Sequence, residues 1–122
     1  MSPDSRFVVT TNLERSFLPY DDERITWFSS VTLMRLDPET GALSRVGDYP
    51  FDGILPEAAA FDASGRYLAV ASYDHFDDRE PGGSVHFWRV AEDRLEAGRV
   101  ELVRTPYRVP VTRGVHSMVL VR

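Results

Sequence analysis

The stretch DASGRYLAVAS, residues 62–72, decides the fold, because a similar sequence, SPDSRFVVTTN, stands at residues 2–12. An offset of sixty residues pairs Arg6 with Arg66, and it pairs the aromatic residues that follow them, Phe7 and Tyr67. In both copies a short polar turn leads into a run of apolar residues, which is the pattern of a turn entering a β-strand. The sequence therefore contains one turn-and-strand unit twice.

Two further segments recur in the same order. VTLMRLDPETGAL at 31–43 is similar to VHFWRVAEDRLEAG at 85–98, and LPEAAAF at 55–61 is similar to RGVHSMV at 113–119. Chance similarity between β-rich segments is a fair explanation for any one pair. Three pairs in one order favour an internal repeat instead.

The recurring pieces are short, rich in Val, Phe, Tyr, Leu and Thr, and bounded by Gly, Pro, Asp or Ser, which predicts strands. The one helix candidate, PEAAAFD at 56–62, is short and stands where the repeat requires a strand, so we assign it to a strand. A repeated four-stranded antiparallel unit is typical of a β-propeller blade. The eight predicted strands lie near 6–12, 29–36, 42–48, 56–61, 66–73, 84–90, 95–103 and 115–121.

The predicted fold is all-β: β-propeller blades of four antiparallel strands, in an incomplete propeller of about two blades. Part of a blade occupies residues 1–48, a second blade 49–103, and a closing inner strand lies within 104–122. A blade is apolar on both faces because it packs between neighbours, so two blades alone leave two apolar faces open. We therefore expect partners for these faces, either the upstream blades of a parent chain or further copies that complete a ring.

The turn-and-strand motif, together with LDPETGAL at 36–43, resembles the β-propeller lactonases, the group named for bacterial 6-phosphogluconolactonase and fungal muconate cycloisomerase. FVVTTN at 7–12 is similar to the Tyr-Val-Thr-Asn repeat propellers. The resemblance covers essentially the whole chain and implies hydrolysis of a sugar-acid or similar lactone without a tightly bound cofactor. The repeat starts and stops partway through a blade, which implies that the chain is a C-terminal portion of such a propeller.

Charge and composition exclude several classes of partner. The 122 residues carry a net charge of −5 without a basic block, which argues against nucleic acid and anionic membranes as partners. The N-terminus has no signal-peptide pattern and no apolar run reaches membrane-helix length, so we favour the cytoplasm, with the periplasm as the alternative. The chain has no Cys, which excludes thiolate chemistry and disulfides.

Four connections are expected at one rim of the blades, at 13–28, 48–55, 74–83 and 104–114. Two of them are lengthened, and long loops on a rigid scaffold are where binding groups concentrate. This rim carries many carboxylates, and it also carries Arg104 and Arg108. A non-catalytic module that binds a small molecule or a protein through this acidic rim is therefore the alternative to a lactonase.

The candidate catalytic residues are Glu57 and His116, at the starts of the innermost strands of adjacent blades. A carboxylate and an imidazole there could serve as general base and acid on a lactone, with Arg113 holding an anionic group. In the lactonases that the chain resembles, a His commonly stands at the place of His116. Asp74 and His75, in a lengthened loop of the same rim, are the further candidates for substrate binding.

These residues also have purely structural alternatives. His116 would then hydrogen-bond across the inner strands and Glu57 would pair with an Arg. The acidic stretch DHFDD at 74–78 lacks the spacing of a calcium loop, so we expect a solvated loop and no metal site. His86 alternates with apolar neighbours in a predicted strand, where it faces another blade or solvent, and we assign it no chemistry.

Overall fold

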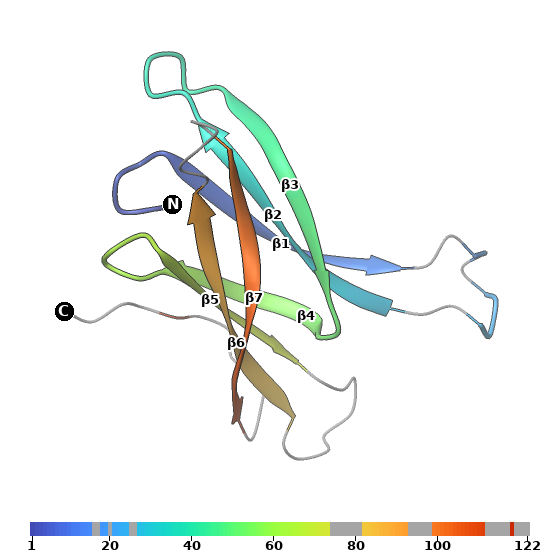
Figure 1. The fold of residues 1–122 in the computed structure, drawn as a ribbon. Coiled ribbons are helices and arrows are strands. Elements are labelled where there is room, and N and C mark those ends of the chain that lie inside the picture. The colour runs from blue at the N-terminus through green and yellow to red at the C-terminus, as the bar shows by residue number, and fades with distance from the viewer. Residues whose placement is uncertain are drawn as a thin grey trace.

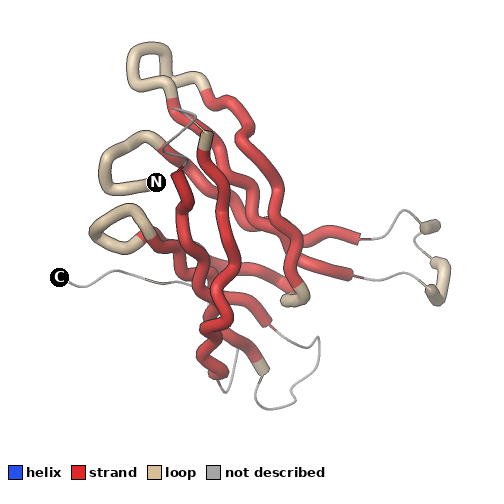
Figure 2. Tube along the Cα trace, viewed as in Figure 1, coloured by secondary structure: helices blue, strands red, loops and turns tan. Residues whose placement is uncertain are grey.

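In the computed structural model the chain is all-β and forms two antiparallel sheets (Figure 1). The structure describes residues 1–15, 18–19, 21–24, 27–73, 82–92, 99–111 and 118. Across these ranges every regular element is a strand (Figure 2), and the described residues include no helix able to cross a membrane. The all-β prediction is confirmed, and sheets of three and four strands are compatible with an incomplete propeller.

Each strand pairs with the strand that follows it in its sheet, as short connections between antiparallel strands allow. We call the first sheet, with strand order β1-β2-β3, sheet A, and the second, with order β4-β5-β6-β7, sheet B. Sheet A comprises β1 (Phe7–Arg15), β2 (Trp27–Leu36) and β3 (Leu43–Phe51). Sheet B comprises β4 (Ile54–Phe61), β5 (Tyr67–Tyr73), β6 (Gly83–Glu92) and β7 (Val100–Val111).

Prolines mark the edges of both sheets. Pro50 lies in β3, Pro56 in β4, and Pro106 and Pro110 in β7, and all three are edge strands. Proline has no N–H to give to a ladder, so it is tolerated where one side of a strand faces no neighbour. The order of strands in each sheet therefore agrees with the positions of these residues in the sequence.

Most of the predicted strands form close to the predicted places. The PEAAAF segment is strand β4, as expected. The last strand of sheet B is displaced: we predicted 95–103 followed by a loop at 104–114, whereas β7 runs to Val111. A bulge opposite residues 86–88 accommodates Pro106, and Thr105 Oγ1 donates to the Phe87 carbonyl oxygen at 2.7 Å. The strand predicted at 115–121 lies, apart from Met118, outside the described residues.

The hydrophobic core lies between the two sheets. Leu33 of sheet A and Leu68 and Val70 of sheet B are completely buried there. Trp88 of β6 meets the ring of Phe51 edge-on, with ring centroids 5.9 Å apart. One face of each sheet is therefore covered by the other sheet, and the opposite face of each is its outer face.

The two sheets have the same register at the predicted offset. Phe7 pairs with Arg35 in sheet A, and Tyr67 pairs with Arg89 in sheet B. Each sheet also has a bulge in the same ladder, next to residue 34 of β2 and next to residue 88 of β6. Strands β1, β2 and β3 thus correspond to β5, β6 and β7, residue by residue in the first two pairs.

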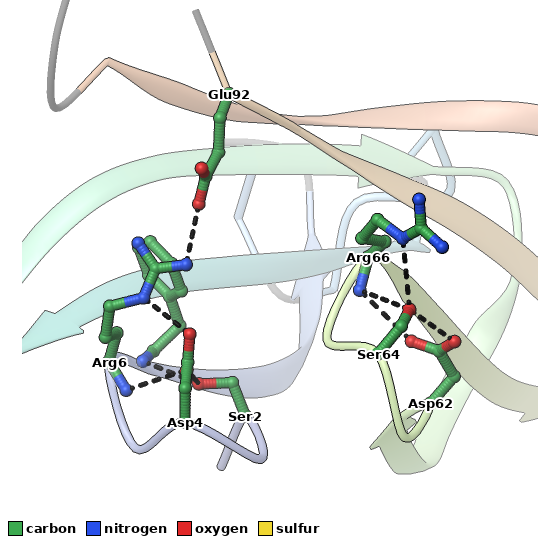
Figure 3. Close-up of polar contacts among 8 residues, drawn as sticks. Ser2, Asp4, Arg6, Asp62, Ser64, Arg66 and Glu92 are labelled. Atoms are coloured by element: carbon green, nitrogen blue, oxygen red, sulfur yellow. Dashed lines mark hydrogen bonds and ion pairs between the residues drawn. The ribbon is translucent and has the colours of Figure 1, made fainter.

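The turns that open β1 and β5 also correspond (Figure 3). The carbonyl oxygen of Arg6 accepts from Leu36 N, and that of Arg66 accepts from Val90 N, each at 2.8 Å. Asp4 Oδ1 accepts from Arg6 N at 3.2 Å, as Ser64 Oγ at the equivalent position accepts from Arg66 N at 3.1 Å. Ser2 Oγ accepts from Phe7 N at 2.9 Å, as Asp62 Oδ1 accepts from Tyr67 N at 3.1 Å. Equivalent residues of the two sequence copies therefore make equivalent contacts.

Candidate functional site

Of the site residues predicted from sequence, only Glu57 lies within the described residues. Asp74, His75, Arg113 and His116 all lie outside them. Glu57 is exposed on the edge strand β4, where the pairing with β5 slips on both sides of Pro56. The predicted pairing of Glu57 with His116 therefore stays a prediction.

The backbone just before Glu57 has an uncommon conformation. Leu55 has φ 47°, in the left-handed region that residues with a Cβ rarely adopt. Local strain of this kind tends to persist where the surrounding structure needs it. The start of β4 is accordingly a distorted edge that presents a carboxylate to solvent.

A cluster of polar side chains that sequence reasoning did not assemble lies where β3 passes into β4. Its centre is Arg104 of β7, whose Nη1 donates to Asp52 Oδ1 at 2.8 Å and whose Nη2 lies 3.0 Å from His86 Nδ1. Asp52 follows the last strand of sheet A, and Arg104 and His86 belong to sheet B. The guanidinium therefore links the two sheets. We call the following residues the edge cluster: Asp52, Ser72, Ser84, His86, Arg104 and Arg108.

The contact between Arg104 and His86 fixes the state of the imidazole. A guanidinium can only donate, so Nδ1 of His86 must accept and the ring is neutral with its proton on Nε2. His86 is 2% exposed and packs against the ring of Phe51, with centroids 5.3 Å apart. The Arg104 guanidinium also lies 5.9 Å from the Phe51 centroid. A buried neutral imidazole thus accepts a hydrogen bond from the Arg104 guanidinium, and the Phe51 ring lies beside both groups.

Asp52 is the exposed member of the cluster. Its hydrogen bond from the Arg104 guanidinium is the largest of the effects that hold the pKa of the Asp52 carboxyl below its ordinary value. The side chain of Asp52 is 77% exposed and that of Arg104 is 37% exposed. An ion pair this open to water contributes little to stability, so the carboxylate is a replaceable partner of Arg104.

Hydroxyl groups complete the edge cluster. Arg108 Nε donates to Ser84 Oγ at 2.7 Å. Ser72 stands opposite Ser84 in the sheet and is completely buried, and its Oγ has no hydrogen-bond partner among the described residues. Buried hydroxyls are normally paired, so the Ser72 hydroxyl is an unused donor and acceptor in the interior, opposite Ser84.

Glycine at position 53 allows the chain to pass close to this cluster. A Cβ built on Gly53 would collide with the side chain of Ser72 and would lie 2.8 Å from a ring carbon of Phe51. The Gly53 carbonyl oxygen accepts from Ser29 Oγ at 2.5 Å. The connection from β3 to β4 is thereby held against sheet B, which places Asp52 beside Arg104.

The chemistry of the edge cluster suits an anion better than a cation or a metal. Arg104 and Arg108 outnumber Asp52, and planar guanidinium groups match carboxylate and phosphate oxygens. Within the described part of the chain, no group of three or more His, Asp or Glu side chains is placed to hold a metal ion. The arrangement can therefore bind and orient a negatively charged group.

Sequence reasoning placed Arg104 and Arg108 at this rim in a loop, which is wrong, because both lie in β7. It left open whether His86 faces another blade or solvent, and the structure places the His86 ring against Phe51 of sheet A. A usable signal was the alternation of Ser84, His86 and Trp88, which predicts one face of β6, with Ser72 opposite it in the preceding strand.

A hollow lies on the outer face of sheet B, away from the edge cluster. Its volume is about 450 Å³, and it is mostly apolar. The hollow is lined by Ala60, Tyr67, Ala69, Val85, Phe87 and Met118, among others.

Comparison of the chain with protein-family models, with curated proteins and with solved structures finds no match.

Proposed function

We propose that this chain is a β-propeller-type binding module that takes up a small anionic molecule at the edge cluster. The observation that carries the proposal is the link from Asp52 through Arg104 to the buried His86. The matching registers and turn contacts of the two sheets support an arrangement of consecutive blades. The rim of such a scaffold is where binding groups gather.

The ligand would replace Asp52 as the partner of Arg104. A phosphate or carboxylate group accepts two parallel N–H bonds from a guanidinium, and Arg108 would bind its remaining oxygens. His86 would keep Arg104 in place from the buried side. Because Asp52 is exposed, its displacement into water costs little.

Calorimetric titration with inorganic phosphate and with gluconate tests this function. Arg104→Gln removes a charge-assisted contact of about 1.5–3 kcal/mol, so binding should weaken by about ten- to a hundredfold. Arg45→Gln is the matched control, because Arg45 pairs with Met34 in sheet A as Arg104 pairs with Trp88 in sheet B. Equal losses in both variants would refute the assignment, as would the absence of heat from both anions.

Asp52→Asn is the complementary variant. It removes the carboxylate that competes for Arg104, and a surface ion pair of up to about 1 kcal/mol corresponds to about two- to fivefold tighter anion binding. An affinity lower than that of the unaltered chain would show that Asp52 belongs to the binding surface and does not compete with the ligand.

Lactone hydrolysis is the second candidate function, and the exposed Glu57 beside the left-handed Leu55 favours it. By the resemblance to the lactonases, Glu57 and His116 would activate water and protonate the leaving group, with Arg113, Asp74 and His75 as substrate contacts. Base uptake during hydrolysis of gluconolactone measures this activity. Turnover that survives both Glu57→Ala and His116→Ala would refute these catalytic roles.

A further inference from the structure

The outer face of sheet B is an apolar surface with a hollow in it. Tyr67 and Ala69 of β5 and Val85 and Phe87 of β6 line this hollow, and Tyr67 is 46% exposed. Small side chains leave the space, since Ala69 is paired with Ala60 of β4 on one side and with Phe87 of β6 on the other. An exposed apolar hollow of this kind marks a binding or association surface.

The register of the two sheets identifies this face. The positions in sheet A that correspond to the four lining residues are Phe7, Val9, Val31 and Leu33. Those four residues belong to the core between the sheets or pack against it. The outer face of sheet B is therefore the counterpart of the face by which sheet A is buried, and it lacks a sheet to cover it among the described residues.

The outer face of sheet A is the counterpart of the surface that sheet B presents to the core. Val8 and Met34 of sheet A correspond to Leu68 and Trp88, which are both buried between the sheets. Met34 and Val8 are paired with each other and stand on the outer side of β1 and β2. They provide the apolar side chains that a hollow lined by alanine requires.

Polar groups on the outer face of sheet A are already paired with one another. Asn12 Nδ2 donates to Ser30 Oγ at 3.1 Å and to Thr32 Oγ1 at 3.0 Å, and Thr32 Oγ1 donates to an Asp48 oxygen at 2.7 Å. Burial of polar groups is tolerated when their hydrogen bonds are made within the chain. This face could therefore be covered without leaving these donors unsatisfied.

Charge indicates how a partner sheet would be aligned (Figure 3). Arg6 reaches across from sheet A to Glu92 of sheet B, with Nη2 and Oε1 2.8 Å apart. The equivalent Arg66 contacts Ser64, with Nε 3.4 Å from Oγ, and forms no ion pair with any described carboxylate. By the same offset, the place of Glu92 in a partner sheet falls in the turn that carries Asp37 and Glu39.

We infer that a second copy of this chain docks the outer face of its sheet A onto the outer face of sheet B. Met34 and Val8 of the second copy fill the hollow, and Asp37 and Glu39 of that copy meet Arg66. The contact repeats the packing of sheet A on sheet B within one chain, so it is head-to-tail. Its two surfaces differ, as in heterologous interfaces. This inference is independent of anion binding.

Two blocking variants and their mixture test the inference by light scattering. Ala69→Glu places a charge in the hollow, and Met34→Glu places one on the opposing face. A buried unpaired charge disrupts such an interface, so each variant alone should associate at least about a hundredfold more weakly than the unaltered chain. Ser44→Glu, at an exposed position of β3 that is paired with Arg35 on the opposite face of sheet A from Met34, is the control and should associate normally.

The mixture carries the decisive result. An equimolar mixture of the two variants retains one intact interface, formed by sheet B of Met34→Glu and sheet A of Ala69→Glu, and should give a one-to-one dimer. A mixture that stays monomeric would overturn the inference. Normal association of Met34→Glu would overturn it too, because sheet B faces would then pair with each other. A monomeric unaltered chain would likewise overturn the inference.

If circular dichroism shows that the blocking variants lack strand structure, charge reversal at Arg66 and Glu39 provides a less disruptive test. Arg66→Glu should weaken association by about two- to fivefold, the range of an exposed ion pair. Glu39→Arg in the same chain should restore it. Equal affinities for the single and double variants, below that of the unaltered chain, would contradict the predicted contact.

Discussion

Gly53→Ala should destabilise the protein, because the connection from β3 to β4 passes too close to sheet B to admit a side chain. The added Cβ would lie 2.8 Å from Phe51 Cε2 and 2.9 Å from Ser72 Cβ, and it would also collide with Ser72 Oγ. Ser72 is completely buried and Phe51 packs on His86 and Trp88. Neither neighbour can turn toward solvent to make room.

The expected cost follows from overpacking in a closed environment. Insertion of a methyl group that forces backbone or side-chain shifts costs about 1–3 kcal/mol, and two unyielding neighbours favour about 2 kcal/mol for Gly53→Ala. Gly47→Ala is the matched control, since its Cβ would meet only the tip of the Tyr49 side chain, at 3.0 Å from the hydroxyl. We expect less than about 1 kcal/mol for that control.

Urea unfolding followed by circular dichroism measures both variants. With a slope of about 1–3 kcal/mol per molar, the midpoint of Gly53→Ala should fall by about 1 M, and its slope should stay unchanged. Ser72→Gly in the Gly53→Ala background should recover part of the loss beyond its own cost, because it removes two of the three close contacts. A Gly53→Ala midpoint equal to that of the Gly47→Ala control would refute the proposed close approach.

The remaining predictions concern the core, the opening turns and acid stability. Leu68→Ala, at a completely buried position between the sheets, should cost about 3–5 kcal/mol in chemical unfolding; a loss below 1 kcal/mol would contradict the packing. Ser5→Gly should stabilise by about 0.5–1 kcal/mol because φ is 59° at Ser5, and Gly65→Ser should cost a similar amount because φ is 71° there; effects of the opposite sign would show that the two turns are not equivalent. The hydrogen bond from the Arg6 guanidinium, and to a smaller extent the one from Ser2, lowers the pKa of Asp4 to about 2. Asp4 therefore stabilises the fold above pH 3.8, its ordinary pKa, and this contribution is lost as the pH falls toward 2. Because Asp4 is 47% exposed, we expect Asp4→Asn to cost only about 1 kcal/mol at pH 6 and nothing near pH 2; a cost that persists at pH 2 would contradict the charge-based explanation.

The fold could be predicted largely because its signals are local and repeated. PEAAAF has helical propensity, yet the repeat placed it in a strand, and it forms β4. The turns before Phe7 and Tyr67 were recognisable from their small polar residues and from the aromatic residue that follows each. Periodicity and turn composition suffice for such features.

The candidate site depends on features that a linear pattern does not carry. The prediction ended the last strand of sheet B at residue 103, whereas β7 continues through Thr105-Pro106, because an edge strand with a bulge tolerates a proline. That error put Arg104 in a loop and separated it from His86. The close approach at Gly53 depends on two sheets meeting, which no local pattern encodes. Glu57 could be selected from sequence, but its exposure could not.

The most direct test of the account is the ¹⁵N spectrum of the His86 ring during titration with inorganic phosphate. At neutral pH the account predicts a neutral ring with the proton on Nε2 and an unprotonated Nδ1 that accepts from Arg104. Phosphate should shift the Nδ1 signal in a saturable manner in the unaltered chain and leave it unmoved in Arg104→Gln. A signal that phosphate does not move in either protein, or an imidazole protonated on both nitrogens, would contradict an anion site built on Arg104.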